Sequence, residues 1–402
     1  DVVFTACRIP NVPNSPSALT SFVIAIKDFE IKDDHTMIVH TSAPTPLMPT
    51  YFANFGILSA TANGVSGDIV YNKEDCGLAA SFPATADFNT GDNEGVAYFK
   101  VNQRSGWRWN TAKAFLRPAR RGGNLEIHIQ AQATGLIFDG TRCIGVRYLR
   151  DGHPAEARAA AEVILSAGSV GSTQLLQLAG IGPAARLKDL GIAPLHDCDA
   201  GENLQDHLQL RLSYRITGGK SLNTMANSLI GKAMIGAEYM LRRSGPMSMA
   251  PSQLGAFARS SDAVERADLE YHVQPLSLEA FGQPPHPFPA ITASVCQLRP
   301  ESRGSIRIAS TDPREAPVIA PNYLSAEADK HVAANAIRLT RRIMAAPSMA
   351  KYRPEEFKPG AQAQSEAELI HAAGDVGTTI FHPVGTCRMG TDPRAVVGPD
   401  LR

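Results

Sequence analysis

The sequence has no surplus of either charge and few cysteines, and both shortages exclude classes of function. Its 402 residues carry 39 lysines and arginines against 39 aspartates and glutamates, so its charge predicts no nucleic-acid partner. The six cysteines form no Cys-x-x-Cys pair and no paired Cys/His spacing, which predicts neither a disulfide framework nor a metal site. No run approaches the roughly 20 apolar residues that a membrane-spanning helix needs. The 44% of hydrophobic residues is typical of a soluble globular protein.

The first sixty residues differ in character from the rest. Short alternating pieces at Phe29–Lys32 and Thr36–His40 are separated by clusters rich in proline, asparagine and serine, which predicts a small β-rich segment. An alanine-, glycine- and serine-rich run follows at 59–70, and we place a domain boundary there. Asp1–Phe4 and Ala43–Pro49 resemble an interior stretch of the peptide-binding proteins of ABC importers. The ligand pocket of such a protein needs two lobes, which this strip cannot supply.

Residues 125–166 predict a β-meander with two tight turns. Asp139-Gly140 and Asp151-Gly152 lie between apolar runs, and the favoured hairpin turn needs positive φ at both of its central positions. The four expected strands are Leu125–Ile129, Ala133–Phe138, Cys143–Leu149 and Ala161–Leu165.

Three helices are predicted from periodicity and end signals. One covers about 172–179 and stops at Gly180, and another covers about 326–345 with Ser325 as its N-cap. The third covers 223–243 and ends before Gly245-Pro246. We expect its apolar residues to pack in the core rather than to form a ligand surface; these are Met225, Leu229, Met234 and Met240.

Two stretches carry candidate chemistry. Residues 162–176 read as a buried strand, a glycine turn and a helix, the arrangement that lets backbone approach a dinucleotide, although any α/β domain has such junctions. In Phe381–Gly390, His382 lies between Phe381 and Pro383, before a glycine-threonine turn. Histidine suits proton transfer near neutral pH. Taken alone, His382 reads more simply as a hydrogen-bonded loop residue.

Several motifs, in order along the chain, resemble the glucose–methanol–choline (GMC) family of FAD-dependent alcohol oxidoreductases. The resemblance spans about 71–402. It rests on Gly106–Ala112, Leu116–Ala119, Asn124-Leu125, Glu162–Leu176, Ala179–Gly182, Gly201–His207, Leu298–Ser305, Pro321–Leu324 and Phe381–Gly390. Asn110 and Thr173 depart from the family pattern.

The resemblance implies specific roles. His382 is expected to be the catalytic base facing the flavin ring, whereas His207 is expected to be structural. Ala133 is expected to meet the FAD adenine through its backbone, although it also reads as an ordinary core strand residue. The turn after the buried strand adds the remaining cofactor contacts, which are Ser166, Ala167 and Gly168.

The chain also lacks parts of the family pattern. It contains no Gly-x-Gly-x-x-Gly loop with its following acidic residue, and only twelve residues follow Gly390, where the family continues to a second catalytic histidine or asparagine. With no initiator methionine at the start, we expect a chain truncated at both ends, with weak or no FAD binding and impaired activity.

We therefore predict an α/β (α+β) chain in four parts. These are an importer-like fragment (1–65), a partial FAD-binding domain without its Rossmann βαβ unit (71–210), an antiparallel-sheet substrate domain (211–375) and a returning segment with the active-site histidine (376–402). The predicted function is FAD-dependent oxidation of a small primary alcohol to an aldehyde in the cytoplasm, with the electron acceptor unspecified. The alternatives are an importer-protein fragment and a non-functional fusion product.

Overall fold

The computed structural model describes residues 26–31, 37–41 and 84–402, apart from positions 86, 92, 251 and 281. Strands β1 (Ile26–Ile31) and β2 (Met37–Thr41) pair antiparallel, which confirms the two extended pieces expected there. Most of the predicted importer-like fragment and its boundary at 59–70 lie outside the described residues, so the four-part division stays a prediction. From residue 84 the described chain forms two compact units, each built from separate stretches of sequence.

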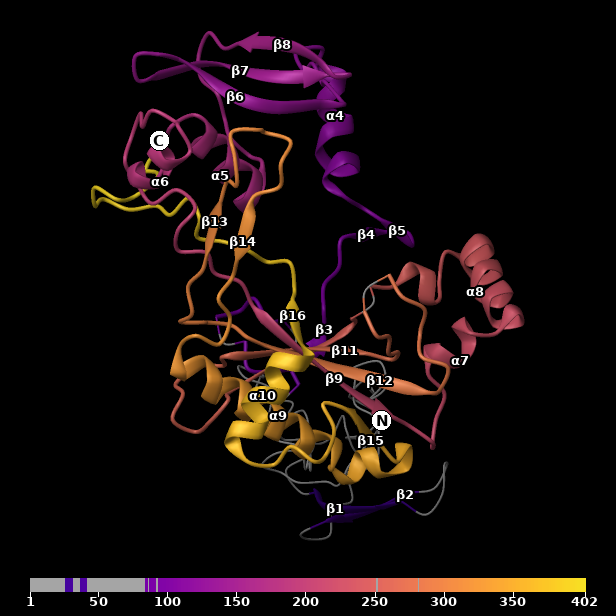
Figure 1. Cartoon of the computed structure of the whole chain (residues 1–402). Coiled ribbons are helices and arrows are strands. Elements are labelled where there is room, and N and C mark those ends of the chain that lie inside the picture. Colours follow the sequence, from indigo (N-terminus) through magenta and orange to yellow (C-terminus); the bar gives the residue numbers. More distant parts are fainter. Residues whose placement is uncertain are drawn as a thin grey trace. The chain divides into compact units, whose positions relative to one another are not determined.

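Unit 1 takes the described residues up to Arg108, Leu210–Cys296 and Ala334–Val376. Its sheet has the strand order β15–β9–β12–β11–β10–β3 (Figure 1), with β10 antiparallel to β11 and β3, and β15 antiparallel to β9. Central strand β12 is buried along nearly its whole length, as its run of small and β-branched residues requires. The strands in this order are β3 (Gly95–Tyr98), β9 (Leu208–Arg215), β10 (Leu254–Ala258), β11 (Leu269–Gln274), β12 (Ala290–Gln297) and β15 (Glu355–Lys358).

Helices α9 (Glu327–Met344) and α10 (Glu366–Val376) complete this core. The hydroxyl groups of Tyr271 on β11 and Thr340 on α9 lie 3.0 Å apart, and Tyr271 is 2% exposed. Arg341 of α9 donates to Glu356 of β15, with Nε and Oε2 2.8 Å apart. The α9 bounds confirm the helix predicted at about 326–345.

The predicted helix 223–243 is two helices, α7 (Leu222–Ala226) and α8 (Leu229–Arg242). Ser228 separates them because its extended backbone and side chain cap the start of α8, accepting the Gly231 N–H. The expectation of core packing was wrong for three of the four named residues. Leu229 is 84% exposed, Met234 61% and Met240 69%.

Unit 2 takes Trp109–Gln209, Gln297–Ala333 and Gly377–Arg402. Its main sheet is a three-stranded antiparallel meander, β6 (Ala131–Asp139), β7 (Arg142–Arg150) and β8 (His153–Arg158). Both predicted turns are present, with positive φ at Gly140, Asp151 and Gly152.

The prediction of the first and the last strand of the meander was wrong. Residues 125–129 and 161–165 form no strand, and β8 occupies the third position instead. Ile129 and Ile164 are each 77% exposed, since no described strand pairs with these segments.

Helix α5 (Gly168–Leu178) contacts β6 and ends two residues before Gly180, whose φ of +85° permits the predicted stop. In the described part of the chain, no helix is both long and apolar enough to cross a membrane. The remaining elements are β4 (Gln103–Arg104), β5 (Trp107–Arg108), η2 (Ala112–Leu116), α4 (Arg117–Ala119), η3 (Arg120–Gly122), α6 (Ala184–Asp189), η4 (Pro246–Ser248), β13 (Ser305–Arg307), β14 (Val318–Ala320), η5 (Pro347–Tyr352) and β16 (Gly377–Thr379).

Candidate functional site

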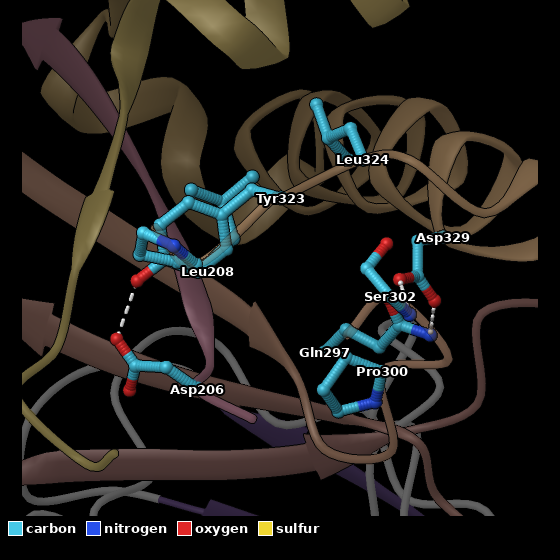
Figure 2. A pocket seen from close by; sticks show the side chains of 9 residues that line it. Asp206, Leu208, Gln297, Pro300, Ser302, Tyr323, Leu324 and Asp329 are labelled. Carbon is cyan, nitrogen blue, oxygen red and sulfur yellow. Dashed lines mark hydrogen bonds between the residues drawn. The ribbon is translucent and has the colours of Figure 1, made fainter. Parts of the chain in front are cut away.

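The backbone of His382 is fixed by a buried carboxylate, Asp206, which is 9% exposed. Its Oδ1 accepts the His382 N–H at 3.0 Å, and its Oδ2 accepts the hydroxyl groups of Thr379 and Tyr323, each at 2.5 Å. Figure 2 shows the bond from Tyr323. Burial, and then the bond to Asp206, raises the pKa of Tyr323, so its hydroxyl stays protonated and donates. The carboxylate thus holds three donors from distant parts of the sequence.

The turn around His382 needs its particular residues. Phe381 has a φ of +64°, which is unusual for a residue other than glycine. Val384 and Gln205 exchange two backbone hydrogen bonds of 2.8 and 2.9 Å. At Gly385, with a φ of +91°, a Cβ would lie 2.3 Å from the Asn203 carbonyl oxygen, so only glycine fits without displacing the backbone.

The start of α5 holds the other side of this turn. The Ser169 hydroxyl donates to the Pro383 carbonyl at 2.5 Å, and the Thr386 hydroxyl donates to the Ser169 carbonyl at 2.9 Å. Thr386 is 1% exposed. The residues that follow His382 are therefore attached to the first turn of the helix that begins at Gly168.

The side chain of His382 is exposed, in contrast to its anchored backbone. Its ring lies 6.0 Å from the ring of His207, at an angle of 82°. Nδ1 of His207 lies 2.7 Å from the Gln297 carbonyl oxygen, which only accepts, so Nδ1 carries the proton and donates. This bond fixes the ring of His207 and agrees with a structural role, whereas His382 stays open to a ligand.

Three of the four predicted cofactor contacts lie at the start of α5. Ser166, Ala167 and Gly168 are exposed, and Gly168 has a φ of +75° with open space where a Cβ would lie. Ala167, the N-cap, supplies no side-chain hydrogen bond to the helix. Ala133 lies on β6, the strand that α5 contacts. Unit 2 thus brings an uncapped helix N-terminus beside the His382 turn, where its amide groups suit an anionic group.

Beside this site lies a pocket whose polar side chains are hydrogen-bonded to other groups of the protein (Figure 2). Asp329 accepts the N–H groups of Glu301 at 2.9 Å and Ser302 at 2.8 Å, and the Gln297 amide at 3.0 Å. Burial alone would raise the pKa of Asp329, but these hydrogen bonds outweigh it and lower the pKa. We therefore interpret this pocket as structural bracing. Its lining residues are Asp206, Leu208, Gln297, Pro300, Ser302, Pro321, Tyr323, Leu324 and Asp329.

No role for Asp206, Tyr323 or Thr379 is predicted from the sequence. The available signal is the position of Asp206 in the Gly201–His207 motif, directly before His207. Its partners lie 117 and 173 residues away, and no local pattern marks contacts at that separation.

Unit 1 holds a cluster of three possible metal-ligating side chains that the sequence spacing does not predict. Potential ligand atoms of Glu270, His272 and Cys296, from neighbouring strands β11 and β12, lie within 4.8 Å of one another. They could hold a metal ion. Oε1 of Glu270 is 3.3 Å from Nε2 of His272, so the direct approach of these two side chains accounts for the grouping without a metal.

Comparison with known protein families gives two matches along this chain. Models described as GMC oxidoreductase match residues 60–209 and 300–402, together more than half of the sequence. An alcohol dehydrogenase [acceptor] of Pseudomonas putida is 37% identical over 330 residues, covering 81% of this chain and 60% of the relative. The mitochondrial choline dehydrogenase of Homo sapiens is 36% identical over 326 residues, covering 80% and 55%.

Solved structures of oxidoreductases have a similar fold. Pyridoxine 4-oxidase from Mesorbium loti superposes with a TM-score of 0.67 at 29% identity, covering 78% of this chain and 58% of that one. A fungal aryl-alcohol oxidase gives 0.69 at 22% identity, covering 80% and 62%, which concerns the fold alone. The chain spans less than two thirds of the length of these relatives. The matches support the oxidoreductase prediction and give no support to the importer-protein alternative.

Proposed function

The chain belongs to the glucose–methanol–choline oxidoreductase family, and from this premise we propose that its site serves FAD-dependent oxidation of a primary alcohol to an aldehyde. One observation carries the proposal. The His382 backbone is anchored on both sides, by Asp206 and by the start of α5, while its side chain remains exposed. An anchored turn with an exposed imidazole is what a positioned general base needs.

In this proposal His382 accepts the proton of the substrate hydroxyl group. FAD would supply, when bound, the acceptor for the hydride of the carbinol carbon, so that alcohol becomes aldehyde and the proton and two electrons are accounted for. Asp206 acts through the backbone of His382 and does not touch the substrate. Ser169 and Thr386 hold the turn against α5, so the base keeps its position when the hydroxyl group arrives.

The residues present fit part of FAD. The exposed backbone at Gly168, its open surroundings and the uncapped start of α5 suit a close approach by the cofactor. Ser166, Ala167 and, through its backbone, Ala133 are the further proposed contacts. The sequence has no Gly-x-Gly-x-x-Gly loop, which would cradle a pyrophosphate. We therefore propose weak FAD binding by the chain as given, and activity after an N-terminal segment and a C-terminal segment of a relative are joined to it.

The test compares the chain as given with such a completed chain. We expect the given chain to purify with little flavin absorbance, and the completed chain to hold flavin that a primary alcohol bleaches under anaerobic conditions. Near-stoichiometric flavin in the given chain would disprove weak binding. A completed chain that binds flavin but is bleached by no primary alcohol would disprove the reaction.

The proposed substrate is a small alcohol, as the names of the alcohol and choline dehydrogenase relatives suggest. The electron acceptor is not specified by any residue of the site. We also propose a cytoplasmic location, with no nucleic-acid partner given the balanced charge.

A further inference from the structure

The outward face of α8 is apolar, which is unusual for a helix on a protein surface. Seven outward residues fall within one arc of about 140° at 100° per residue. They are Leu229, Ile230, Ala233, Met234, Ala237, Met240 and Leu241. Ile230 is 75% exposed and Leu241 83%. Figure 1 shows α8 at the margin of unit 1.

Contacts on the inward face fix this orientation. Gly231 is buried, and a Cβ there would lie 2.2 Å from the Met225 carbonyl oxygen, so this side of the helix is pressed against α7. Glu238 is also on the inward side, where its carboxylate accepts the Ser244 hydroxyl at 3.1 Å. The helix therefore places its one acidic residue toward the protein and its large apolar residues toward solvent, the reverse of an ordinary surface helix.

Positive charge borders the apolar face, and an aromatic ring lies at the C-terminal end of α8. Lys232 and Arg242 are exposed, and they fall on opposite sides of the arc. Arg243, the C-cap, lies over the Trp107 ring with 4.4 Å between its Cζ and the ring centroid, and Trp107 is 45% exposed. No acidic residue lies on the outward side of α8.

From this arrangement we infer that α8 docks on an anionic lipid surface, lying in the plane of the headgroups. The continuous apolar face matches the acyl boundary of such a surface, and the basic residues at its edges match the anionic headgroups. A second copy of the chain would bring Lys232 and Arg242 toward like charges across a two-fold axis, whereas anionic headgroups complement them. The helix lies on the membrane, in keeping with the finding that no described helix could cross one.

The test is flotation of the full chain with vesicles of phosphatidylcholine, with or without phosphatidylglycerol. We expect binding to the anionic vesicles that weakens as salt is raised. The double variant Ile230→Glu/Leu241→Glu should bind at least about tenfold more weakly, because two charges replace apolar contacts. Glutamate is well tolerated in helices, and an unchanged far-UV circular dichroism spectrum shows that α8 persists.

Ile164→Glu is the matched control, because Ile164 is 77% exposed and lies in unit 2. This variant should bind vesicles within about twofold of the parent. The inference fails if the parent chain does not float, or if the control loses as much binding as the double variant. It also fails if light scattering shows a parent dimer that the double variant abolishes, since the occupant is then a second copy.

Discussion

Replacing Asp206 with asparagine tests the anchor of the His382 turn, and its effect can be worked out from three hydrogen bonds. The best orientation keeps the amide oxygen toward the His382 N–H and turns the NH₂ group toward the hydroxyl groups of Tyr323 and Thr379. Both hydroxyl groups must then rotate to accept. A bond to a charged group exceeds a neutral one by about 1 kcal/mol, and all three bonds lose the charge of the carboxylate, so the expected loss is about 3 kcal/mol.

The measurement is amide hydrogen exchange of the peptide that contains residues 379–386. A local loss of about 3 kcal/mol should speed its exchange by about 150-fold, with smaller changes in peptides of unit 1. Asp189→Asn, at an exposed aspartate of unit 2, is the control and should leave exchange within about twofold of the parent. If Asp206→Asn also leaves the 379–386 peptide unchanged, the carboxylate does not hold the turn and the reasoning is wrong.

Three further predictions address the base, the core of unit 1 and acid stability. In the completed chain, His382→Ala should slow anaerobic flavin reduction by about 10²–10⁴-fold with little change in flavin content, whereas His207→Ala should mainly lower the melting temperature; equal rates for parent and His382→Ala would exclude His382 as the base. Arg341→Met should destabilise unit 1 by about 3–5 kcal/mol in urea unfolding, because it leaves the carboxylate of Glu356, 8% exposed, unpaired; a change below about 1 kcal/mol would contradict this. The folded-state pKa of Asp329 is lowered, so its carboxylate stabilises the fold above the unfolded pKa, and this contribution is lost as pH falls through the folded pKa. Below about pH 4 the free energy of unfolding of Asp329→Asn should therefore fall less than that of the parent. Parallel plots of unfolding free energy against pH for the two proteins would refute this role of Asp329.

The local elements were predictable where short-range chemistry decides them. The glycine stop after α5 and the two Asp-Gly turns follow from backbone conformation alone, and α9 follows from its apolar spacing. The break between α7 and α8 is readable in principle, because Ser228 is a good N-cap, but the predicted helix followed the apolar pattern across it.

Long-range features were beyond local patterns. Whether 125–129 and 161–165 form strands depends on a partner strand that supplies a ladder, and apolar content cannot show whether one is there. The orientation of α8 depends on which face finds a neighbour, so Met234 and Met240 could not be placed from their spacing. His382 was identified by a motif. The role of its anchor Asp206 follows only from the fold, which brings Asp206 into contact with Thr379, 173 residues further along the chain.

The two bonds between Ser169 and the His382 turn also set the order in which this site can be completed. Their partners lie 214 and 217 residues apart, and two stretches of unit 1 lie between them in the sequence. During synthesis from the N-terminus, α5 therefore leaves the ribosome long before Pro383 and Thr386 exist. The contacts that the first turn of α5 makes with Pro383 and Thr386 must therefore wait until more than 200 further residues are made, and contacts of such separation form slowly. A ribosome that stops before residue 383 would release a chain with much of both units but without the two bonds that attach the His382 turn to α5.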